Sequence, residues 1–299
     1  MAAVLIAFTI DFVSIGNAGN GDDLGAGGGS YSTPYGGVGY AYRMGAYEIS
    51  QDAITKATNL GFTNVTAGAW DASQPAANMT WFEAAAFVNW LNTSTGHQAA
   101  YQLNGVTGLT LWSSGDAWQA DGVNLYRHKD AYYFMPSEDE WYKAAYHKND
   151  GVTANYWDYA TGSNSAPTQE LIGGTLAGSA VYALNAQNRP ADPADVNRAG
   201  GLSPYGTMGQ NGNVREWAES AYDGSNNSSS ENRPVRGGGW ADTEFNLRSS
   251  DRVLEFDPLD SDGSVGFRVA SVVPEPSSIV LLLGSAWMWL LKRRRGVAL

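Results

Sequence analysis

The 299-residue sequence contains no cysteine and only three histidines. Without cysteine there can be no disulfide bonds, thiolate nucleophiles, Cys-ligated zinc or iron–sulfur clusters. The spacing of His97, His128 and His147 matches no helical pair of metal ligands. Redox chemistry and transition-metal sites are therefore not expected, and neither copper nor zinc is predicted as a cofactor.

Positive charge is also scarce. The chain has 18 Lys and Arg against 30 Asp and Glu, which gives a formal charge of −12. Four of the 18 basic residues lie together at 292–295, so the remainder of the chain has 14 basic residues against 30 acidic ones. Such a surface repels phosphate backbones, and nucleic acid is not an expected partner. It suits divalent cations or an extracellular setting.

A continuous apolar run ends the chain, in VPEPSSIVLLLGSAWMWLLKRRRGVAL. The segment from Ser277 to Leu291 is uncharged, and a basic cluster follows at once, as expected for a cytoplasmic stop. About 15 helical residues reach only ~22 Å, whereas the hydrocarbon core of a bilayer is ~30 Å thick. The tail is therefore predicted to be a marginal membrane span.

The same tail resembles the PEP-CTERM sorting signal, in which a Pro-Glu-Pro triplet, a short apolar helix and a basic cluster follow one another. The matching residues are Pro274, Glu275, Pro276, Lys292, Arg293, Arg294 and Arg295. The resemblance implies transient residence in the inner membrane, cleavage by an exosortase-type enzyme, and delivery to the outer surface or extracellular matrix of a Gram-negative bacterium. A permanent single-pass anchor is the alternative, and both place the main domain outside the cytoplasm.

The N-terminal stretch MAAVLIAFTIDFVSIGNAG is apolar but lacks the basic start of a signal peptide. We interpret residues 1–16 as a partial or mis-started signal segment. The expected division is thus 1–16, a main domain at 17–271, and a sorting or anchor segment at 272–299.

Two stretches carry helix-start signals. In TWFEAAAFVNWLNTSTG, Thr80 and Glu83 form a capping box, apolar residues recur at helical spacing, and Gly96 is a plausible stop. In PSEDEWYKAAYHK, Ser137 and Glu140 form a second box, so these carboxylates are interpreted as capping groups and not as a catalytic pair. Short aromatic runs between Gly, Asn, Asp and Pro fill the rest, which predicts one compact α+β domain with short strands and long ordered loops.

Five motifs occur in a specific order between about residues 40 and 270. They are TWFEAAAFVNWLN, YYFMPSEDEWYKAAYH, SPYGTMGQNGNVREWAES, RPVRGGGWADTEFNLRSSDR and VGFRVA. Together they resemble the sulfatase-modifying factor family, whose best-known members are formylglycine-generating enzymes. The resemblance implies an irregular, loop-rich α+β fold similar to the C-type lectin fold. It also implies a structural role for Arg268 in the last motif.

Within GNVREW, the resemblance implies a structural calcium held by the carbonyls of Gly212 and Val214 and by the Glu216 carboxylate, all oxygen ligands. The family's usual Asp or Asn three residues earlier is Gly209 here, and Asn211 or a water is the expected substitute. The alternative is that Glu216 pins the loop to an arginine, Arg236 or Arg248. Farther on, FDPLDSDGS lacks the acid spacing of a calcium loop and is interpreted as a turn.

In the formylglycine-generating branch, two cysteines after the glycine-rich turn bind copper. Aligning RGGGW with that turn puts Asp242 and Leu247 at their positions, and neither can serve as a thiolate ligand. The oxidase reaction of that branch is therefore excluded. Other branches hold iron with histidines from an added helical domain; neither such a domain nor enough histidines is recognised in this sequence, so an iron site of that kind is not expected.

Two kinds of function remain for the glycine-rich stretch. The first is a non-catalytic module that binds a glycan, a matrix polymer or an envelope protein through Trp240, Asp242, Arg248 and Arg252. The second is an enzyme of unrecorded type, with Asp242 as general base or hard-metal ligand and Arg248 or Arg252 stabilising charge. A purely structural envelope component is a third possibility.

Overall fold

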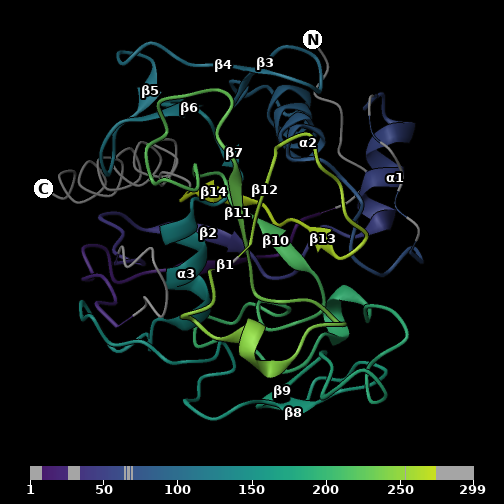
Figure 1. Cartoon of the computed structure of the whole chain (residues 1–299). Coiled ribbons are helices and arrows are strands. Elements are labelled where there is room, and N and C mark those ends of the chain that lie inside the picture. Colours follow the sequence, from purple (N-terminus) through teal and green to yellow (C-terminus); the bar gives the residue numbers. More distant parts are fainter. Residues whose placement is uncertain are drawn as a thin grey trace, which may run out of the picture.

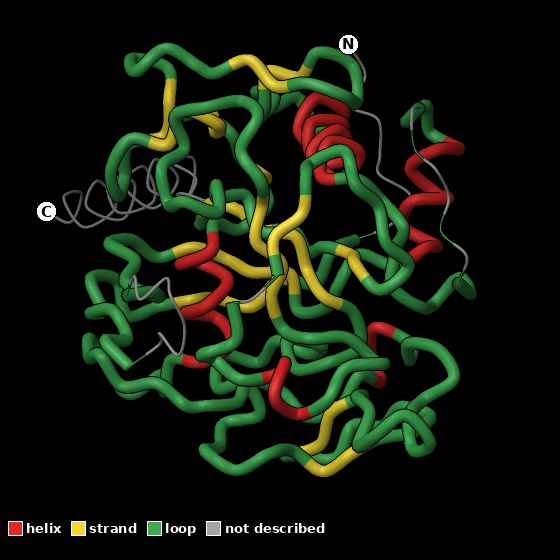
Figure 2. The backbone as a smooth tube through the Cα atoms, viewed as in Figure 1, coloured by secondary structure: helices red, strands yellow, loops and turns green. Residues whose placement is uncertain are grey.

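The computed structural model describes residues 9–25, 34–63, 65, 68, 70–252 and 254–273. Loops make up most of this part of the chain, and the regular elements between them are short (Figures 1 and 2). The helices are α1 (Gln51–Asn59), α2 (Trp81–Ser94) and α3 (Glu138–Tyr146), with 3₁₀ turns at Val196–Arg198 and Glu244–Leu247. The strands are β1 (Phe12–Ile15), β2 (Tyr42–Gly45), β3 (Gln102–Leu103), β4 (Leu109–Thr110), β5 (Ala117–Trp118), β6 (Asn124–His128), β7 (Tyr133–Phe134), β8 (Thr168–Gln169), β9 (Ser179–Ala180), β10 (Arg215–Trp217), β11 (Arg233–Arg236), β12 (Glu255–Phe256), β13 (Val265–Gly266) and β14 (Ala270–Val272).

Two four-stranded sheets lie at the centre of the molecule (Figure 1). One has the order β1-β2-β14-β7 and is antiparallel throughout. The other has the order β12-β11-β10-β13, in which β10 and β13 run parallel. Strand β14 lies between β2 and β7, so the last described residues complete a sheet that begins near the N-terminus. The predicted irregular, loop-rich α+β fold is confirmed.

Strand β1 takes four residues from the stretch that the sequence assigned to a signal segment. It pairs with β2 from Phe12 opposite Gly45 to Ile15 opposite Tyr42, and Ile15 is fully buried. This part of the stretch therefore belongs to the folded domain. The sorting motif lies outside the described residues, and over the described ones no helix has the length and apolar character needed to cross a membrane.

The two predicted helix starts are confirmed. The Thr80 side chain accepts the Glu83 amide while the Glu83 carboxylate accepts the Thr80 amide, and Ser137 and Glu140 do the same for α3. Helix α2 ends at Ser94, and Gly96 follows with a φ of 83°. Helix α1 was not predicted from the sequence, although its cap, Ser50, accepts a hydrogen bond from the backbone of the third helical residue.

The core has two main parts on different sides of the sheets. Helices α1 and α2 lie together at one side of the molecule and α3 at another (Figure 1). The larger apolar cluster joins α1 and α2 to residues near β13 and β14, including Phe267 and Val269. A second cluster packs Ala144 of α3 against Tyr42, Met44 and Ala270 of the first sheet. This packing fixes the loops that carry the motifs.

Candidate functional site

The glycine-rich loop after β11 depends on backbone conformations that only glycine adopts easily. Gly237 and Gly238 have φ values of 94° and 68°. A Cβ atom at Gly238 would lie 2.7 Å from the Leu247 side chain. The loop is anchored further by the Trp240 amide, which donates to the Asn213 carbonyl at 2.7 Å. The glycines therefore allow the loop to pack closely over the residues that follow it.

Asp242 and Leu247 occupy the two positions where the resemblance places cysteines, and both have structural contacts. Asp242 Oδ1 forms an ion pair with Arg215 at 2.5 Å, and Oδ2 accepts the Gly239 amide at 2.7 Å. Burial raises the pKa of Asp242, and Arg215 opposes that shift. Leu247 is fully buried beside Tyr159 and other apolar residues. Because both Asp242 oxygens are hydrogen-bonded, this carboxylate is poorly placed to act as a general base.

Trp240 lies beside a second tryptophan. Its ring meets Trp70 edge to face at 6.0 Å, and the Arg189 guanidinium lies 5.6 Å from its centre. Its Nε1 is buried and has no hydrogen-bond partner among the described residues. The Trp240 ring thus packs against two side chains of the protein itself, Trp70 and Arg189.

Arg252 is a structural residue. It is buried and donates to both oxygens of Glu138 at 2.8 and 2.9 Å, and also to the Tyr222 carbonyl. Arg236 approaches the same Glu138 carboxylate at 3.2 Å. Burial tends to lower the pKa of Arg252, but Glu138 outweighs it and the pKa is raised. Arg252 is therefore not exposed for ligand binding.

Arg248 is exposed, and it lines a pocket of about 530 Å³. We call this the Arg248 pocket; it is lined by Asp23, Gly25, Tyr156, Asp158, Tyr159, Asn164, Ala166, Glu244, Arg248, Ser249 and Ser250. Trp240, Asp242 and Arg252 do not line it. The structure therefore divides the four predicted binding residues, and only Arg248 opens onto this pocket. Its volume is within the usual range for small-molecule sites.

The Arg248 pocket contains polar groups with unused hydrogen-bonding capacity. Arg248 Nε donates to Tyr159 Oη at 3.0 Å, while its two terminal nitrogens have no hydrogen-bond partner among the described residues. The carboxylates of Asp158 and Glu244 likewise accept no hydrogen bond within the described part of the chain. The Arg248 guanidinium also lies 4.6 Å from the Phe245 ring. Donors and acceptors thus converge beside aromatic side chains.

Of the residues that line this pocket, only Arg248 was predicted from the sequence as a site residue. Tyr156, Asp158 and Tyr159 come from the aromatic run ANYWDYATG, which is far from Arg248 in the chain. The alternation of aromatic and polar residues in that run was the only signal. The fold brings the run beside Arg248, where the Ser249 amide donates to the Asp158 carbonyl at 2.8 Å.

The predicted calcium ligand Glu216 has an arginine as its partner. Arg268 donates to both Glu216 oxygens at 2.5 Å, and Trp141 Nε1 donates to Oε2 at 2.8 Å. Arg268 also donates to the carbonyls of Gly45 and Met208, both at 2.9 Å. The structural role expected for Arg268 is confirmed. Because the guanidinium already occupies the carboxylate, this donor set does not fit a calcium ion.

The other two predicted calcium ligands also have packing roles. A Cβ atom at Gly212 would lie 2.1 Å from the Val181 carbonyl, and Val214 is fully buried. The sequence left a pin between Glu216 and Arg236 or Arg248 as the alternative, and the observed arginine is Arg268 instead. The predicted turn at FDPLDSDGS is confirmed: the Asp257 and Asp262 side chains each accept a backbone amide two residues on.

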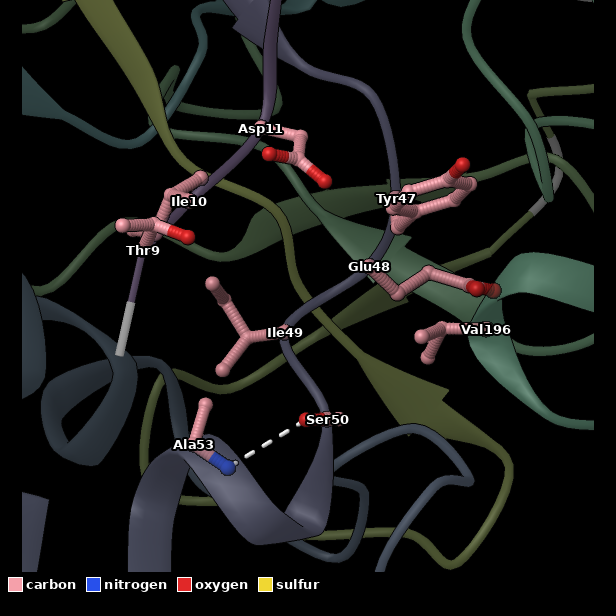
Figure 3. A pocket seen from close by; sticks show the side chains of 9 residues that line it. All are labelled: Thr9, Ile10, Asp11, Tyr47, Glu48, Ile49, Ser50, Ala53 and Val196. Atoms are coloured by element: carbon pink, nitrogen blue, oxygen red, sulfur yellow. Dashed lines mark hydrogen bonds between the residues drawn. The ribbon is translucent and has the colours of Figure 1, made fainter. Parts of the chain in front are cut away.

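Glu48 is a second buried carboxylate in this region. Asn213 Nδ2 donates to both of its oxygens at 3.1 and 3.0 Å. Burial raises the pKa of Glu48, Glu216 raises it further, and Arg268 opposes both. Glu48 lines a pocket of only about 120 Å³ and its side chain extends toward Val196 (Figure 3). This space holds a few water molecules at most, and no group of three acidic or histidine side chains that could bind a metal occurs within the described ranges.

A sequence profile of the sulfatase-modifying factor enzyme 1-like domain (FGE-sulfatase) matches residues 38–273. Among solved structures, the chain is similar to CarF, with a TM-score of 0.61, 18% identity, and coverage of 89% of this chain and 99% of that one. It is also similar to Treponema denticola variable protein 1, with a TM-score of 0.60, 19% identity, and coverage of 90% and 98%.

A third similar structure is PvdO from Pseudomonas aeruginosa, with a TM-score of 0.54, 16% identity, and coverage of 88% of this chain and 92% of that one. At these identities the likeness concerns the fold alone. A comparison with curated protein sequences finds no match.

Proposed function

This chain belongs to the sulfatase-modifying factor family, and from that premise we propose that it is a non-catalytic module that binds a glycan. The observation that supports this most is the contrast between Asp242 and Leu247, which are packed and paired, and the Arg248 pocket, which has unpaired polar groups. The scaffold is present, and the two positions where a cysteine pair is expected have structural roles instead.

The chemistry of the Arg248 pocket suits a polyhydroxylated ligand. Sugar hydroxyls both donate and accept, so they need neighbouring donors and acceptors, which Arg248, Asp158 and Glu244 supply. Tyr156, which is partly exposed, provides a flat surface for the apolar face of a sugar ring. A matrix polymer built of sugars would be recognised in the same way, whereas an envelope protein needs a larger contact surface.

We further propose that the module acts outside the cytoplasm. The support comes from the sequence of the tail, where the Pro274–Pro276 triplet precedes an apolar run and the basic residues at 292–295. An exosortase-type enzyme is the expected processing partner, with the inner membrane as a transient location. Display at the outer surface would place the Arg248 pocket among extracellular polysaccharides.

The decisive experiment is binding of the full-length chain to a panel of bacterial and algal polysaccharides. Arg248→Met removes the guanidinium but keeps most of the aliphatic stem, and Arg198→Met is the matched control at an exposed arginine outside the pocket. We expect Arg248→Met to weaken binding at least about tenfold and Arg198→Met to leave it unchanged. Binding unaffected by Arg248→Met, or no binding to any polysaccharide, would overturn the proposal and favour a protein partner.

A further inference from the structure

A second polar cavity, of about 260 Å³, lies beside the N-terminal end of α3. We call it the Asp139 cavity. It has no lining residue in common with the Arg248 pocket, and it is assembled from the segment before β2, the β5–β6 hairpin, the start of α3 and the loops after β10. Its role is therefore separate from the glycan site proposed above.

A buried ion network forms one wall of the Asp139 cavity. Arg127 of β6 is fully buried and pairs with Glu140 and Glu219, in each case at 2.7 Å. Tyr40 donates to Glu140 at 2.7 Å and Tyr101 donates to Glu219 at 2.9 Å. The network holds two carboxylates and one guanidinium, so Arg127 has no positive charge to spare for a ligand.

Two more carboxylates line the cavity, and each has one unused oxygen. Asp121 Oδ2 accepts the Gly39 amide at 2.8 Å, and Asp139 Oδ1 accepts the Gly36 amide at 2.9 Å. The second oxygen of each accepts no hydrogen bond from the described residues. Lys143 lies near Asp121, but its ammonium donates to the Asn17 carbonyl at 3.0 Å and it does not line the cavity.

Two serine hydroxyls and two aromatic rings also line the Asp139 cavity. Ser137 Oγ and Ser220 Oγ each accept a backbone amide, at 3.2 and 3.0 Å, and neither hydroxyl donates to an acceptor within the described part of the chain. Tyr40 and Trp118 meet edge to face at 5.3 Å. The cavity therefore combines unused acceptors with a partly aromatic wall.

From this arrangement we propose that the Asp139 cavity binds a protonated primary amine, with Asp121 and Asp139 as its acceptors. An ammonium has three donors in a compact group, which matches two separate carboxylate oxygens and a hydroxyl. A guanidinium favours both oxygens of one carboxylate, and here one oxygen of each is already taken by a backbone amide. A calcium ion needs six or more oxygen ligands, and the described residues hold no group of three acids that could bind a metal.

The cavity volume limits the ligand to the size of a single sugar or amino acid. The amine can thus belong to an amino sugar or to a lysine side chain of another protein. These two sources share the ammonium group, and three probes distinguish them: glucosamine, N-acetylglucosamine, and Nα-acetyl-lysine methylamide. The acetylated sugar keeps the ring and hydroxyls but has no positive charge.

The test is calorimetric titration of the full-length chain with each probe. We expect glucosamine, the lysine analogue, or both to bind, and N-acetylglucosamine to bind at least about tenfold more weakly. Asp139→Asn and Asp121→Asn keep an acceptor for their backbone amides but remove the charge, and each should weaken amine binding about tenfold. Asp260→Asn is the matched control, since Asp260 is exposed and outside the cavity.

Each outcome has a defined meaning. Binding of glucosamine alone indicates an amino sugar, and binding of the lysine analogue alone indicates a protein partner. Equal binding of N-acetylglucosamine and glucosamine would overturn the proposal, as would the absence of binding by both amines. Unchanged affinity in both cavity variants would also overturn it, provided that their urea unfolding shows they are folded. Arg248→Met should weaken polysaccharide binding and leave amine binding unchanged, so the two proposals can be tested independently.

Discussion

The loop that follows β11 has two parts with opposite character. Asp242 and Leu247 hold the loop in place: Asp242 is hydrogen-bonded through both oxygens and Leu247 is fully buried. Glu244 and the residues from Arg248 to Ser250 line an open pocket instead, where the terminal nitrogens of Arg248 have no partner among the described residues. Residues that follow one another in the chain thus hold the scaffold together in one part and face a pocket in the other.

This contrast separates the residues that stabilise the scaffold from those that face the pocket. Strand β11, which precedes the loop, pairs with β10, where Arg268 neutralises Glu216 and bonds to backbone carbonyls; we call Arg268 and Glu216 the supporting layer. Stability and ligand contact are therefore carried by different residues, and they can be altered separately.

The largest effect is expected from Arg268→Met. It leaves the Glu216 carboxylate fully buried without a counter-charge and close to Glu48. Removing one partner of a buried ion pair costs about 3–5 kcal/mol of unfolding free energy. Urea unfolding measures it, with Arg198→Met as an exposed control expected to change stability by about 0.5 kcal/mol or less. A change below about 1 kcal/mol in Arg268→Met would show that the loop does not depend on this layer.

Leu247→Ala should come next. The Leu247 side chain fills a buried site beside Tyr159 and packs so close to Gly238 that a Cβ atom there would meet it. Truncation therefore leaves a cavity under the loop. Leu→Ala changes at such sites cost about 2–5 kcal/mol. Thermal and urea unfolding measure the loss of unfolding free energy. Polysaccharide binding should weaken only if the substitution disorders the loop. A neutral result would mean that the loop is not packed as described.

The neighbouring Arg248→Met should show the reverse pattern. Since Arg248 is exposed and makes one hydrogen bond, to Tyr159, its loss should change the unfolding free energy by only about 0.5 kcal/mol. Polysaccharide affinity should nevertheless fall at least about tenfold, because a guanidinium in a ligand site supplies charge-assisted hydrogen bonds. A loss of stability equal to that of Leu247→Ala would remove the distinction between the two parts of the loop.

Sequence reasoning succeeded where the signal is local or where chemistry excludes an option. The capping pairs Thr80–Glu83 and Ser137–Glu140 predicted α2 and α3, because such boxes depend on residues three apart. The motif order predicted the loop-rich fold. The absence of cysteine ruled out a thiolate site regardless of structure.

It failed where the answer depends on contacts between distant segments. The sequence grouped Arg248 with Arg252, yet the pairing of Arg252 with Glu138 joins residues 114 positions apart and removes Arg252 from the site. The partner of Glu216 was likewise unpredictable: the sequence suggested Arg236 or Arg248, and only tertiary packing selects Arg268. Helix α1 was missed because its nine residues give a short periodic signal.

A smaller change in stability is expected from Asp139→Asn in the Asp139 cavity, because one oxygen of this carboxylate has no partner among the described residues. Burial raises the pKa of Asp139 from its ordinary 3.8 to about 7, and Glu138 and two further acids add to it. A raised carboxyl pKa means that ionisation opposes folding, so this group lowers stability as pH rises from about 4 to about 7. Asp139→Asn should therefore gain stability relative to the unaltered chain between pH 4 and pH 8.

The expected gain is about 1–2 kcal/mol, less than the full pKa difference gives at about 1.4 kcal/mol per pH unit, because the side chain is partly exposed. Urea unfolding of both proteins at pH 4, 6 and 8 checks it. Asp260→Asn serves again as the control. A difference that is constant with pH would show that Asp139 ionises in the folded state as readily as in the unfolded chain.

The smallest effect should come from removing divalent cations. A calcium ion present at 1,000 times its Kd stabilises a folded protein by about 4 kcal/mol, which is easily seen as a shift in Tm. Here the Arg268 guanidinium donates to both oxygens of Glu216, so the positive charge that such an ion would bring is already part of the chain. We expect calcium and a chelator to give the same Tm. A rise in Tm with calcium would mean that Glu216 exchanges its arginine for an ion, and Glu216→Gln should then abolish that rise.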